Sequence, residues 1–260
     1  MLAINRKQEH TGSYYAETVN NSTAYPALEG AETADVCVVG AGFTGVATAL
    51  TLAERGYSVA LVEANRVGWG ASGRNGGQLI NGISGLDKIR KKHGDGIANM
   101  LWDLKWRGND IVYERVEKYG IDCDLKQGFV ETATKPRHLE YIREYAEERR
   151  NRNHPYPYEV WDQEQTRENL GTDAFVGAFA CYRDGHLHPL NLCIGEARAA
   201  ESLGVKIFEQ SPVNGIEHGA RHRIRTANGH VDADAVVLAC NAYSLFETKQ
   251  LSNLVFPAGS

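Results

Sequence analysis

The sequence predicts an α/β fold in which a parallel sheet flanked by helices is interrupted by a second, α+β domain. A strand–helix–strand pattern over residues 34–63 is the first observation, and a return of this pattern from Pro189 onwards is the second. The third is the stretch between them, residues 88–187, where charged helices alternate with short strands. A chain of 260 residues is long enough to bury a sizeable core.

The composition is that of an ordinary globular protein, with 42% apolar and 23% charged residues. The net charge of −5 argues against a nucleic-acid partner, which would favour a basic excess. No apolar stretch is long enough to span a membrane or to form a signal core, so we expect a cytoplasmic protein. The five cysteines lack metal-binding spacing, and we expect reduced thiols and no metal.

The first strand is predicted at 34–39, after an irregular N-terminal arm over residues 1–33. A helix follows over 42–55, because its apolar residues recur on one face and Gly56 stands at a C-cap position. The second strand is predicted at 58–63. These three segments make a β-α-β unit.

The remaining elements follow from the same patterns. Helices are predicted at 94–119, 135–152 and 189–203, and strands at 129–133, 158–161, 175–180, 205–208, 213–218, 222–226, 230–232 and 235–239. The charged run 143–152 is expected to be a solvated helix face. We therefore predict a dinucleotide-binding domain over 34–87 and 188–250, a substrate or cap domain over 88–187, and the start of a further strand at 251–260.

The segment Gly40-Ala-Gly42-Phe-Thr-Gly45 has the G-x-G-x-x-G spacing of a Rossmann dinucleotide-binding turn. Gly40 permits the tight turn, Gly42 lets the backbone approach a pyrophosphate, and Gly45 lets the helix pack on the strand. The helix N-terminus offers unpaired N–H groups to phosphates. Glu63, 18 residues after Gly45, ends the second strand, where a carboxylate can bind ribose hydroxyls.

Residues 68–77 contain five glycines in ten positions, which suggests that backbone passes close to a large ligand. The motif alone fits NAD as well as FAD, and this glycine-rich segment favours FAD.

The chain also resembles the D-amino-acid oxidase/glycine oxidase superfamily of FAD enzymes, and within it the bacterial members that oxidise γ-glutamylputrescine. The resemblance rests on the segments 35–45, 63–68 and 70–78, and extends to 13–16, 119–124, 185–192 and 236–243. It implies an FAD site formed by Gly40, Ala41, Gly42, Phe43, Thr44, Gly45, Glu63, Ala64, Ala71, Ser72, Arg74, Asn75, Gly76, Gly77, Gln78, Val213, Cys240 and Asn241.

The resemblance further implies that a neutral amine gives a hydride to the flavin and that the resulting imine is hydrolysed to aldehyde and ammonia. Oxygen or another acceptor would reoxidise the flavin. Arg74 and His186 are the candidate catalytic residues, and His188 is expected in a capping or turn role. Trp102 and Trp106 are expected in the core or at a domain interface rather than in a substrate cage.

Members of this superfamily continue well beyond the point where this chain stops, so we expect a truncated chain that lacks part of its flavin pocket. Its unpaired strand edges would then allow self-association. Two alternatives remain open. One is an oxidase of glycine, sarcosine or a D-amino acid, and the other is a non-catalytic nucleotide-binding fragment or partner-dependent subunit.

Overall fold

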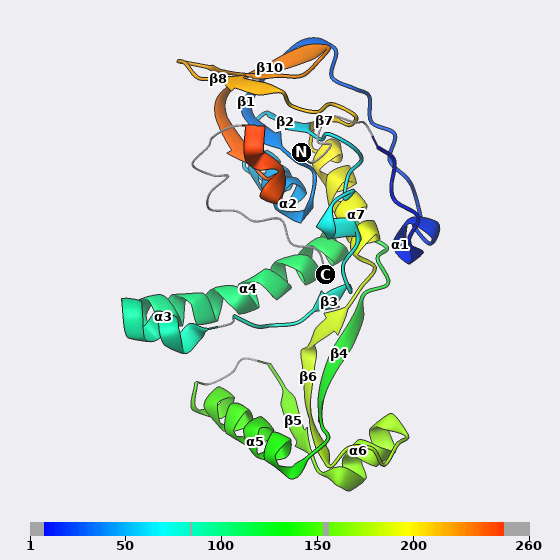
Figure 1. Ribbon diagram of the computed structural model, residues 1–260, viewed down its shortest axis with the longest axis vertical. Coiled ribbons are helices and arrows are strands. Elements are labelled where there is room, and N and C mark those ends of the chain that lie inside the picture. The colour runs from blue at the N-terminus through cyan, green and yellow to red at the C-terminus, as the bar shows by residue number, and fades with distance from the viewer. Residues whose placement is uncertain (1–7, 84, 153–155, 247–260) are drawn as a thin grey trace. The chain divides into compact units, whose positions relative to one another are not determined.

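Residues 8–83, 85–152 and 156–246 are described by the computed structural model shown in Figure 1. They fall into two compact units. The first comprises residues up to 76, 115–123 and those from 188 onwards, and the second comprises 77–114 and 124–187. The strand predicted to start at 251–260 lies outside the described residues.

A six-stranded sheet in the order β7-β2-β1-β10-β9-β8 forms the centre of the first unit. Its strands are β1 (Gly30–Val39), β2 (Val59–Val62), β7 (Lys206–Phe208), β8 (Gly215–Glu217), β9 (His222–Arg225) and β10 (Gly229–Leu238). The strands β7, β2, β1 and β10 run parallel, and β9 and β8 continue the sheet antiparallel. The predicted α/β fold with a parallel sheet is thereby confirmed.

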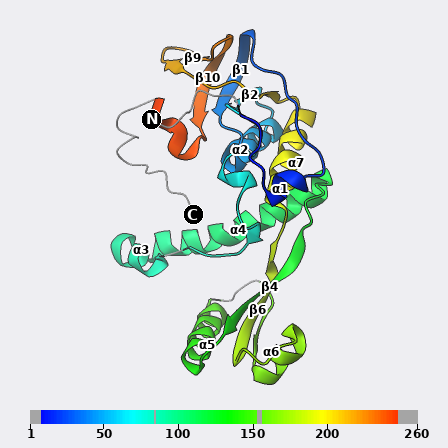
Figure 2. The same ribbon diagram turned by 45° about the vertical axis from the view of Figure 1, so that its right-hand side comes forward.

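Two helices, α2 (Phe43–Glu54) and α7 (Pro189–Ser202), lie side by side on one face of this sheet (Figures 1 and 2). Successive side chains of a strand point to opposite faces of the sheet, which explains this arrangement. Val36 and Val38 of β1 pack under the helices, whereas Cys37 and Val39 point to the opposite face. On that face Cys37 and Val39 belong to a second hydrophobic core, which includes Ile224. Every strand of this parallel set is therefore covered on both faces.

The first unit extends further than the predicted domain boundaries, because two segments are fastened to it by buried polar contacts. In the N-terminal arm, which includes the short helix α1 (Tyr14–Glu17), Leu28 is 1% exposed and its N–H donates to Ser211 Oγ at 2.8 Å. In 115–123, the Arg115 guanidinium lies 2.8 Å from the Glu196 carboxylate on α7. Conversely, residues 77–87, predicted with the first domain, belong to the second unit.

The second unit contains an antiparallel sheet in the order β3-β6-β4, with β5 paired to β6. Its strands are β3 (Gln78–Leu79), β4 (Lys126–Ala133), β5 (Tyr158–Trp161) and β6 (Gly177–His186), and its helices are α3 (Leu86–His93), α5 (Pro136–Asn151), α6 (Gln163–Leu170) and all but the last turn of α4 (Asp95–Tyr119). Ile142 and Ala146 of α5 pack against Phe179 of β6.

Several element predictions need correction. The strands predicted at 230–232 and 235–239 are one strand, β10, because it pairs with β1 along its length. Helix α6 was not predicted, although Asp162 and Gln165 form a capping box at its start. The run 143–152 is not wholly solvated, because Arg149 is 1% exposed. Its guanidinium donates to Tyr145 Oη at 2.7 Å and lies 4.7 Å from the ring centroid of Phe179.

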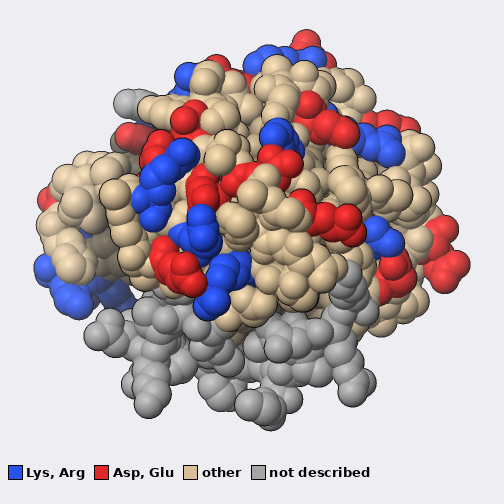
Figure 3. All heavy atoms as spheres, turned by 90° about the horizontal axis from the view of Figure 1, so that it is seen from above, with Lys and Arg blue, Asp and Glu red and all other residues tan. Residues whose placement is uncertain are grey.

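Charged side chains of both signs mix on the face seen in Figure 3. Opposite charges are paired along β9 and β10, for example Arg223 with Asp232 at 2.8 Å and Arg221 with Asp234 at 2.9 Å. None of the helices among the described residues has the length and apolar character needed to cross a membrane.

Candidate dinucleotide site

The parallel strands of the first unit all end at one edge of the sheet. Val39 of β1 is in register with Val62 of β2 and Leu238 of β10, and Val62 is in register with Phe208 of β7. The residues that follow these strands therefore meet at this edge: Gly40–Gly45, Glu63, Glu209 and 239–241. In parallel α/β sheets, ligands bind beyond the carboxyl ends of the strands.

The turn between β1 and α2 is built from close backbone contacts. Gly40 has a φ of +102°, a conformation that other residues rarely adopt. A Cβ on Gly45 would lie 1.8 Å from the Gly40 carbonyl oxygen, so only glycine lets the helix start this close to the turn. The first turn of α2 directs its N–H groups beyond the end of β1.

Ser72 provides the cap of this helix from a distant part of the sequence. The N-cap Gly42 has no side chain, and the Phe43 N–H donates instead to Ser72 Oγ at 2.9 Å. A Cβ on Gly42 would lie 2.8 Å from the same oxygen. The short 3₁₀ helix η1 (Ala71–Gly73) thereby holds the 68–77 segment against the Gly40–Gly45 turn.

The Glu63 carboxylate accepts two main-chain hydrogen bonds at the sheet edge, from Ala41 N–H at 2.7 Å and from Asn65 N–H at 2.9 Å. Burial raises the pKa of Glu63, and these N–H groups oppose that rise. A carboxylate offers about four lone-pair positions, so acceptor capacity remains for a ribose hydroxyl. The neighbouring Ala64 is half-buried.

Some of the glycines in 68–77 are explained by close contacts within the segment itself and not by a ligand. A Cβ on Gly73 would lie 2.3 Å from the Gly68 carbonyl oxygen, so these two backbones touch each other. Exposed Arg74 lies with its guanidinium carbon 4.9 Å from the Trp69 ring centroid, and its Nε donates to Gly70 O at 3.2 Å. Asn75 donates to Ala71 O and Ser72 O, and Gly76 is exposed.

Val213 lies on a loop of the first unit, and Cys240 and Asn241 lie where β10 leads into the 3₁₀ helix η2 (Asn241–Phe246). Val213 is buried after β7, and its main-chain N–H and C=O have no partner among the described residues. The segment beside it runs along the Glu63 loop, since Ser211 N–H donates to Glu63 O at 2.8 Å. Cys240 and Asn241 follow β10, and a Cβ on Gly40 would lie 3.2 Å from Cys240 Cα.

Five of the predicted residues belong to the second unit: Gly77, Gln78, Trp102, Trp106 and His186. Gln78 of β3 pairs with His186 of β6, and Leu187 N–H donates to Gly77 O at 2.8 Å. Trp102 and Trp106 are buried, with ring centroids 6.2 Å apart in an edge-to-face arrangement.

His188 belongs to the first unit and caps α7, in agreement with its predicted role. Its Nδ1 accepts the Asn191 N–H at 3.1 Å.

Glu209 was missed in the sequence and organises the loop after Glu63. It is fully buried, and its carboxylate lies 2.8 Å from the Arg66 guanidinium and accepts the Val67 N–H at 2.8 Å. Thr23 Oγ1 also donates to it. The available signal was its position, because Glu209 directly follows β7 as Glu63 directly follows β2.

These residues fit an FAD pyrophosphate and ribose. Each of the three glycines of the turn, Gly40, Gly42 and Gly45, leaves no room for a Cβ, the start of α2 carries N–H donors, and Glu63 retains acceptor capacity. Within the described ranges, no group of three or more His, Cys, Asp and Glu side chains is arranged to hold a metal ion.

Comparison with known proteins gives relatives over most of the chain. A probable oxidoreductase OrdL of Haemophilus influenzae is 44% identical over 239 residues, which are 91% of this chain and 55% of that protein. The gamma-glutamylputrescine oxidoreductase of Escherichia coli is 42% identical over 236 residues, which are 90% of this chain and 55% of that protein. The chain thus spans about half the length of these curated relatives.

Solved structures show the same fold. An L-amino acid deaminase from Proteus vulgaris matches with a TM-score of 0.73 and 26% identity, over 95% of this chain and 62% of that one. Glycine oxidase from Geobacillus kaustophilus matches with a TM-score of 0.65 and 26% identity, over 82% of this chain and 56% of that one. The family model described as FAD dependent oxidoreductase matches residues 35–260, and the chain therefore belongs to this family.

Proposed function

We propose that this chain binds FAD at the carboxyl edge of its parallel sheet and that the protein oxidises an amine. The convergence of the Gly40–Gly45 turn, the start of α2 and Glu63 at that edge is the observation that carries the proposal. A helix N-terminus with a glycine turn suits the pyrophosphate, and a carboxylate at the end of the second strand suits the ribose.

The other residues of the first unit would contact the remaining parts of the cofactor. The free main-chain groups of Val213 suit the adenine edge, and Ser72 would stand beside the pyrophosphate through its bond to the Phe43 N–H. Arg74, Asn75 and Gly76 would follow the ribityl chain, and Cys240 and Asn241 would close the phosphate side. In the second unit, Gly77, Gln78 and His186 remain proposed flavin or substrate contacts.

Bound FAD supplies a two-electron acceptor, so that a C–N bond is oxidised to an imine. Water then converts the imine to an aldehyde and ammonia, and oxygen or another acceptor takes up the electrons. The chain's own residues orient the cofactor and exclude water from it. The 42% identity with the E. coli gamma-glutamylputrescine oxidoreductase supports γ-glutamylputrescine, or a related polyamine derivative, as substrate.

One other function has a specific observation in its favour. The match to glycine oxidase at a TM-score of 0.65 supports an oxidase of glycine, sarcosine or a D-amino acid. A non-catalytic nucleotide-binding fragment or a partner-dependent subunit is the alternative from another class, and flavin reduction by an amine distinguishes it from an oxidase.

The decisive experiment measures FAD binding and reduction separately. The purified chain is incubated with FAD, separated from excess FAD, and examined for flavin absorbance. We expect bound flavin in the wild type and much less bound flavin in Glu63→Gln. The control Glu217→Gln, at an exposed site on β8, should bind nearly as much flavin as the wild type. Flavin bleaching and hydrogen peroxide release are then followed with γ-glutamylputrescine, putrescine, glycine, sarcosine and D-alanine.

Each outcome selects one function. Bleaching by γ-glutamylputrescine supports the proposed substrate, and bleaching by glycine or D-alanine alone replaces it with the amino-acid oxidase. Bound FAD that no amine bleaches supports the fragment or the partner-dependent subunit. Absence of any FAD binding would refute the proposed site.

A further inference from the structure

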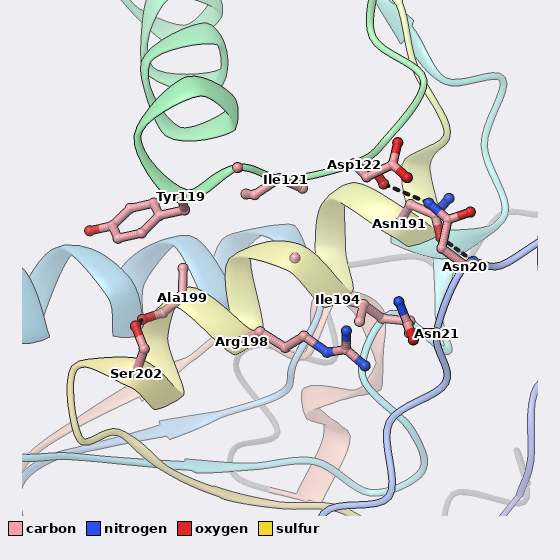
Figure 4. Close-up of a pocket in the computed structure, with 12 residues that line it drawn as sticks. Asn20, Asn21, Tyr119, Ile121, Asp122, Asn191, Ile194, Arg198, Ala199 and Ser202 are labelled. Carbon is pink, nitrogen blue, oxygen red and sulfur yellow. Dashed lines mark hydrogen bonds between the residues drawn. The ribbon is translucent and has the colours of Figure 1, made fainter.

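A cavity of about 260 Å³ lies along one face of α7, and none of the predicted cofactor residues lines it (Figure 4). Its lining comes from the N-terminal arm, from the end of α4 and the segment that follows it (119–122), and from positions 191, 194, 195, 198, 199 and 202 of α7. This spacing of three and four residues places the α7 positions on a single helix face. All of these segments belong to the first unit.

Part of the cavity wall is apolar. Ile121, Ile194 and Ala199 line it, and Ile121 packs so closely on Gly195 that an added Cβ there would lie 2.2 Å from the Ile121 Cγ2. An apolar wall of this kind suits a short aliphatic chain.

A buried hydrogen-bond donor lines one end of the cavity. Asn191 is 5% exposed, and its Oδ1 accepts the Asn20 N–H at 3.0 Å. Its Nδ2 is buried and has no hydrogen-bond partner among the described residues. A buried donor without an acceptor is costly, so a ligand that supplies an oxygen here would be favoured.

A positive charge lies on the same face. Arg198 extends along α7 toward Asn21 (Figure 4) and donates from Nη2 to Ser22 O at 3.4 Å, which leaves most of its five N–H donors for a ligand. Within the described ranges, Arg198 forms no ion pair with a carboxylate. Guanidinium groups recognise carboxylates through paired hydrogen bonds.

We propose that this cavity binds a small carboxylate with a short aliphatic chain, held by the Arg198 guanidinium and the Asn191 amide. The aliphatic part lies over Ile121 and Ile194, and the carboxylate faces the polar end formed by the arm and α7. This site is separate from the dinucleotide site, and the proposal does not depend on FAD binding.

The experiment uses the purified FAD-free chain and sodium butyrate as the probe, with binding followed by saturation-transfer NMR or titration calorimetry. We expect butyrate to bind in the millimolar range and Arg198→Gln to weaken it by about tenfold or more. Asn191→Asp keeps the acceptor for Asn20 N–H but removes the donor, and it should weaken binding similarly. Arg55→Gln, an exposed arginine outside the cavity, is the matched control and should bind as the wild type does.

Inorganic phosphate and butylamine complete the set. Binding of phosphate in place of butyrate would overturn the carboxylate assignment. Binding of butylamine as strong as that of butyrate would show that the charge of Arg198 is irrelevant. Absence of butyrate binding, or binding unaffected in both cavity variants, would refute the site, provided that circular dichroism shows both variants folded.

Discussion

The contact between Gly45 and Gly40 shows why a single methyl group matters at this turn. A Cβ on Gly45 would meet the Gly40 carbonyl oxygen, and a carbonyl of the turn cannot move without displacing the end of β1. We predict that Gly45→Ala lowers the free energy of unfolding by about 1–3 kcal/mol, as overpacking does, and also lowers FAD affinity. Chemical denaturation and flavin titration would measure the two effects.

Gly108→Ala is the matched control. Gly108 also lies in a helix, but nothing lies within 4 Å of its missing Cβ. Alanine is about 1 kcal/mol more favourable than glycine at such a position, so the control should be neutral or stabilising. Equal destabilisation by both substitutions would contradict the importance of the Gly40–Gly45 contact.

Lys105 gives a second prediction at the scale of one residue. Its Nζ lies 3.5 Å from the Trp102 ring centroid and 4.7 Å from that of Trp106. Burial, together with the positive charge of Arg149, lowers the pKa of Lys105 to about 8. Between pH of about 8 and the usual value of 10.5 the unfolded chain holds a proton that the folded chain has released, so the Lys105 contribution to unfolding free energy rises with pH across this window.

Competitive acetylation, read by peptide mass spectrometry as a function of pH, would measure this pKa. Lys118 is an internal control, because hydrogen bonding to the Glu54 carboxylate raises its pKa. We expect Lys105 to become reactive at lower pH than Lys118. The same reactivity profile for both lysines would contradict the predicted shift.

Among the elements, the last turn of α4 depends on one buried ion pair. Arg115 Nη1 donates to Glu196 of α7 at 2.8 Å, and Nη2 donates to Thr51 of α2 at 2.7 Å. Both charged side chains are less than one-tenth exposed. Arg115→Met should cost about 3–5 kcal/mol, because it leaves the Glu196 carboxylate buried and unpaired.

The double variant Arg115→Met with Glu196→Leu tests the reason. With both charges removed, most of the lost stability should return. Denaturant unfolding of the two single variants and the double variant gives the coupling energy. A double variant as unstable as the sum of the singles would show that the two side chains act independently.

The sequence predicted the elements best where periodicity and a stop signal agreed. The helix over 42–55 and the strand at 58–63 were predicted nearly at their observed bounds, whereas the strand predicted at 34–39 begins four residues earlier, at Gly30. In contrast, β10 was split into two strands because Asp232 and Asp234 interrupt its apolar pattern. Those side chains are paired with Arg223 and Arg221, a tertiary arrangement that single-strand periodicity does not contain.

Geometry at the candidate site was only partly visible in the sequence. The Gly40–Gly45 spacing predicted a turn, and the turn lies at the end of β1. The hydrogen bond from the Phe43 N–H to Ser72 joins residues that are 29 positions apart in the sequence. Glu209 lies at least 142 positions from its partners Arg66 and Val67. Such contacts depend on strand order, which local patterns do not specify.

At the scale of the whole molecule, the described chain has separate hydrophobic cores in its two units. Leu50 belongs to a core of the first unit, and Ile142 to a core of the second. Three of the four tryptophans lie in the second unit, so their fluorescence reports on that unit, whereas bound FAD would report on the first.

We predict that Ile142→Ala lowers the midpoint temperature of the transition seen by tryptophan fluorescence. We predict that Leu50→Ala lowers the temperature at which flavin is released. Each substitution should cost about 2–5 kcal/mol in its own core. Thermal scans that record both signals on the same sample would measure this. Coincident shifts of both signals in both variants would mean that the cores unfold as a single cooperative unit.

The continuity of β10 determines where this chain can change its length. Because β10 pairs with β1 from Gly229 to Leu238, one residue inserted anywhere along it would turn the following side chains to the wrong face and shift Cys240 past Gly40. The turn at 218–221, outside that register, is free of this constraint. We therefore expect peptide tags and extra residues to be accepted at 218–221 and rejected within 229–238.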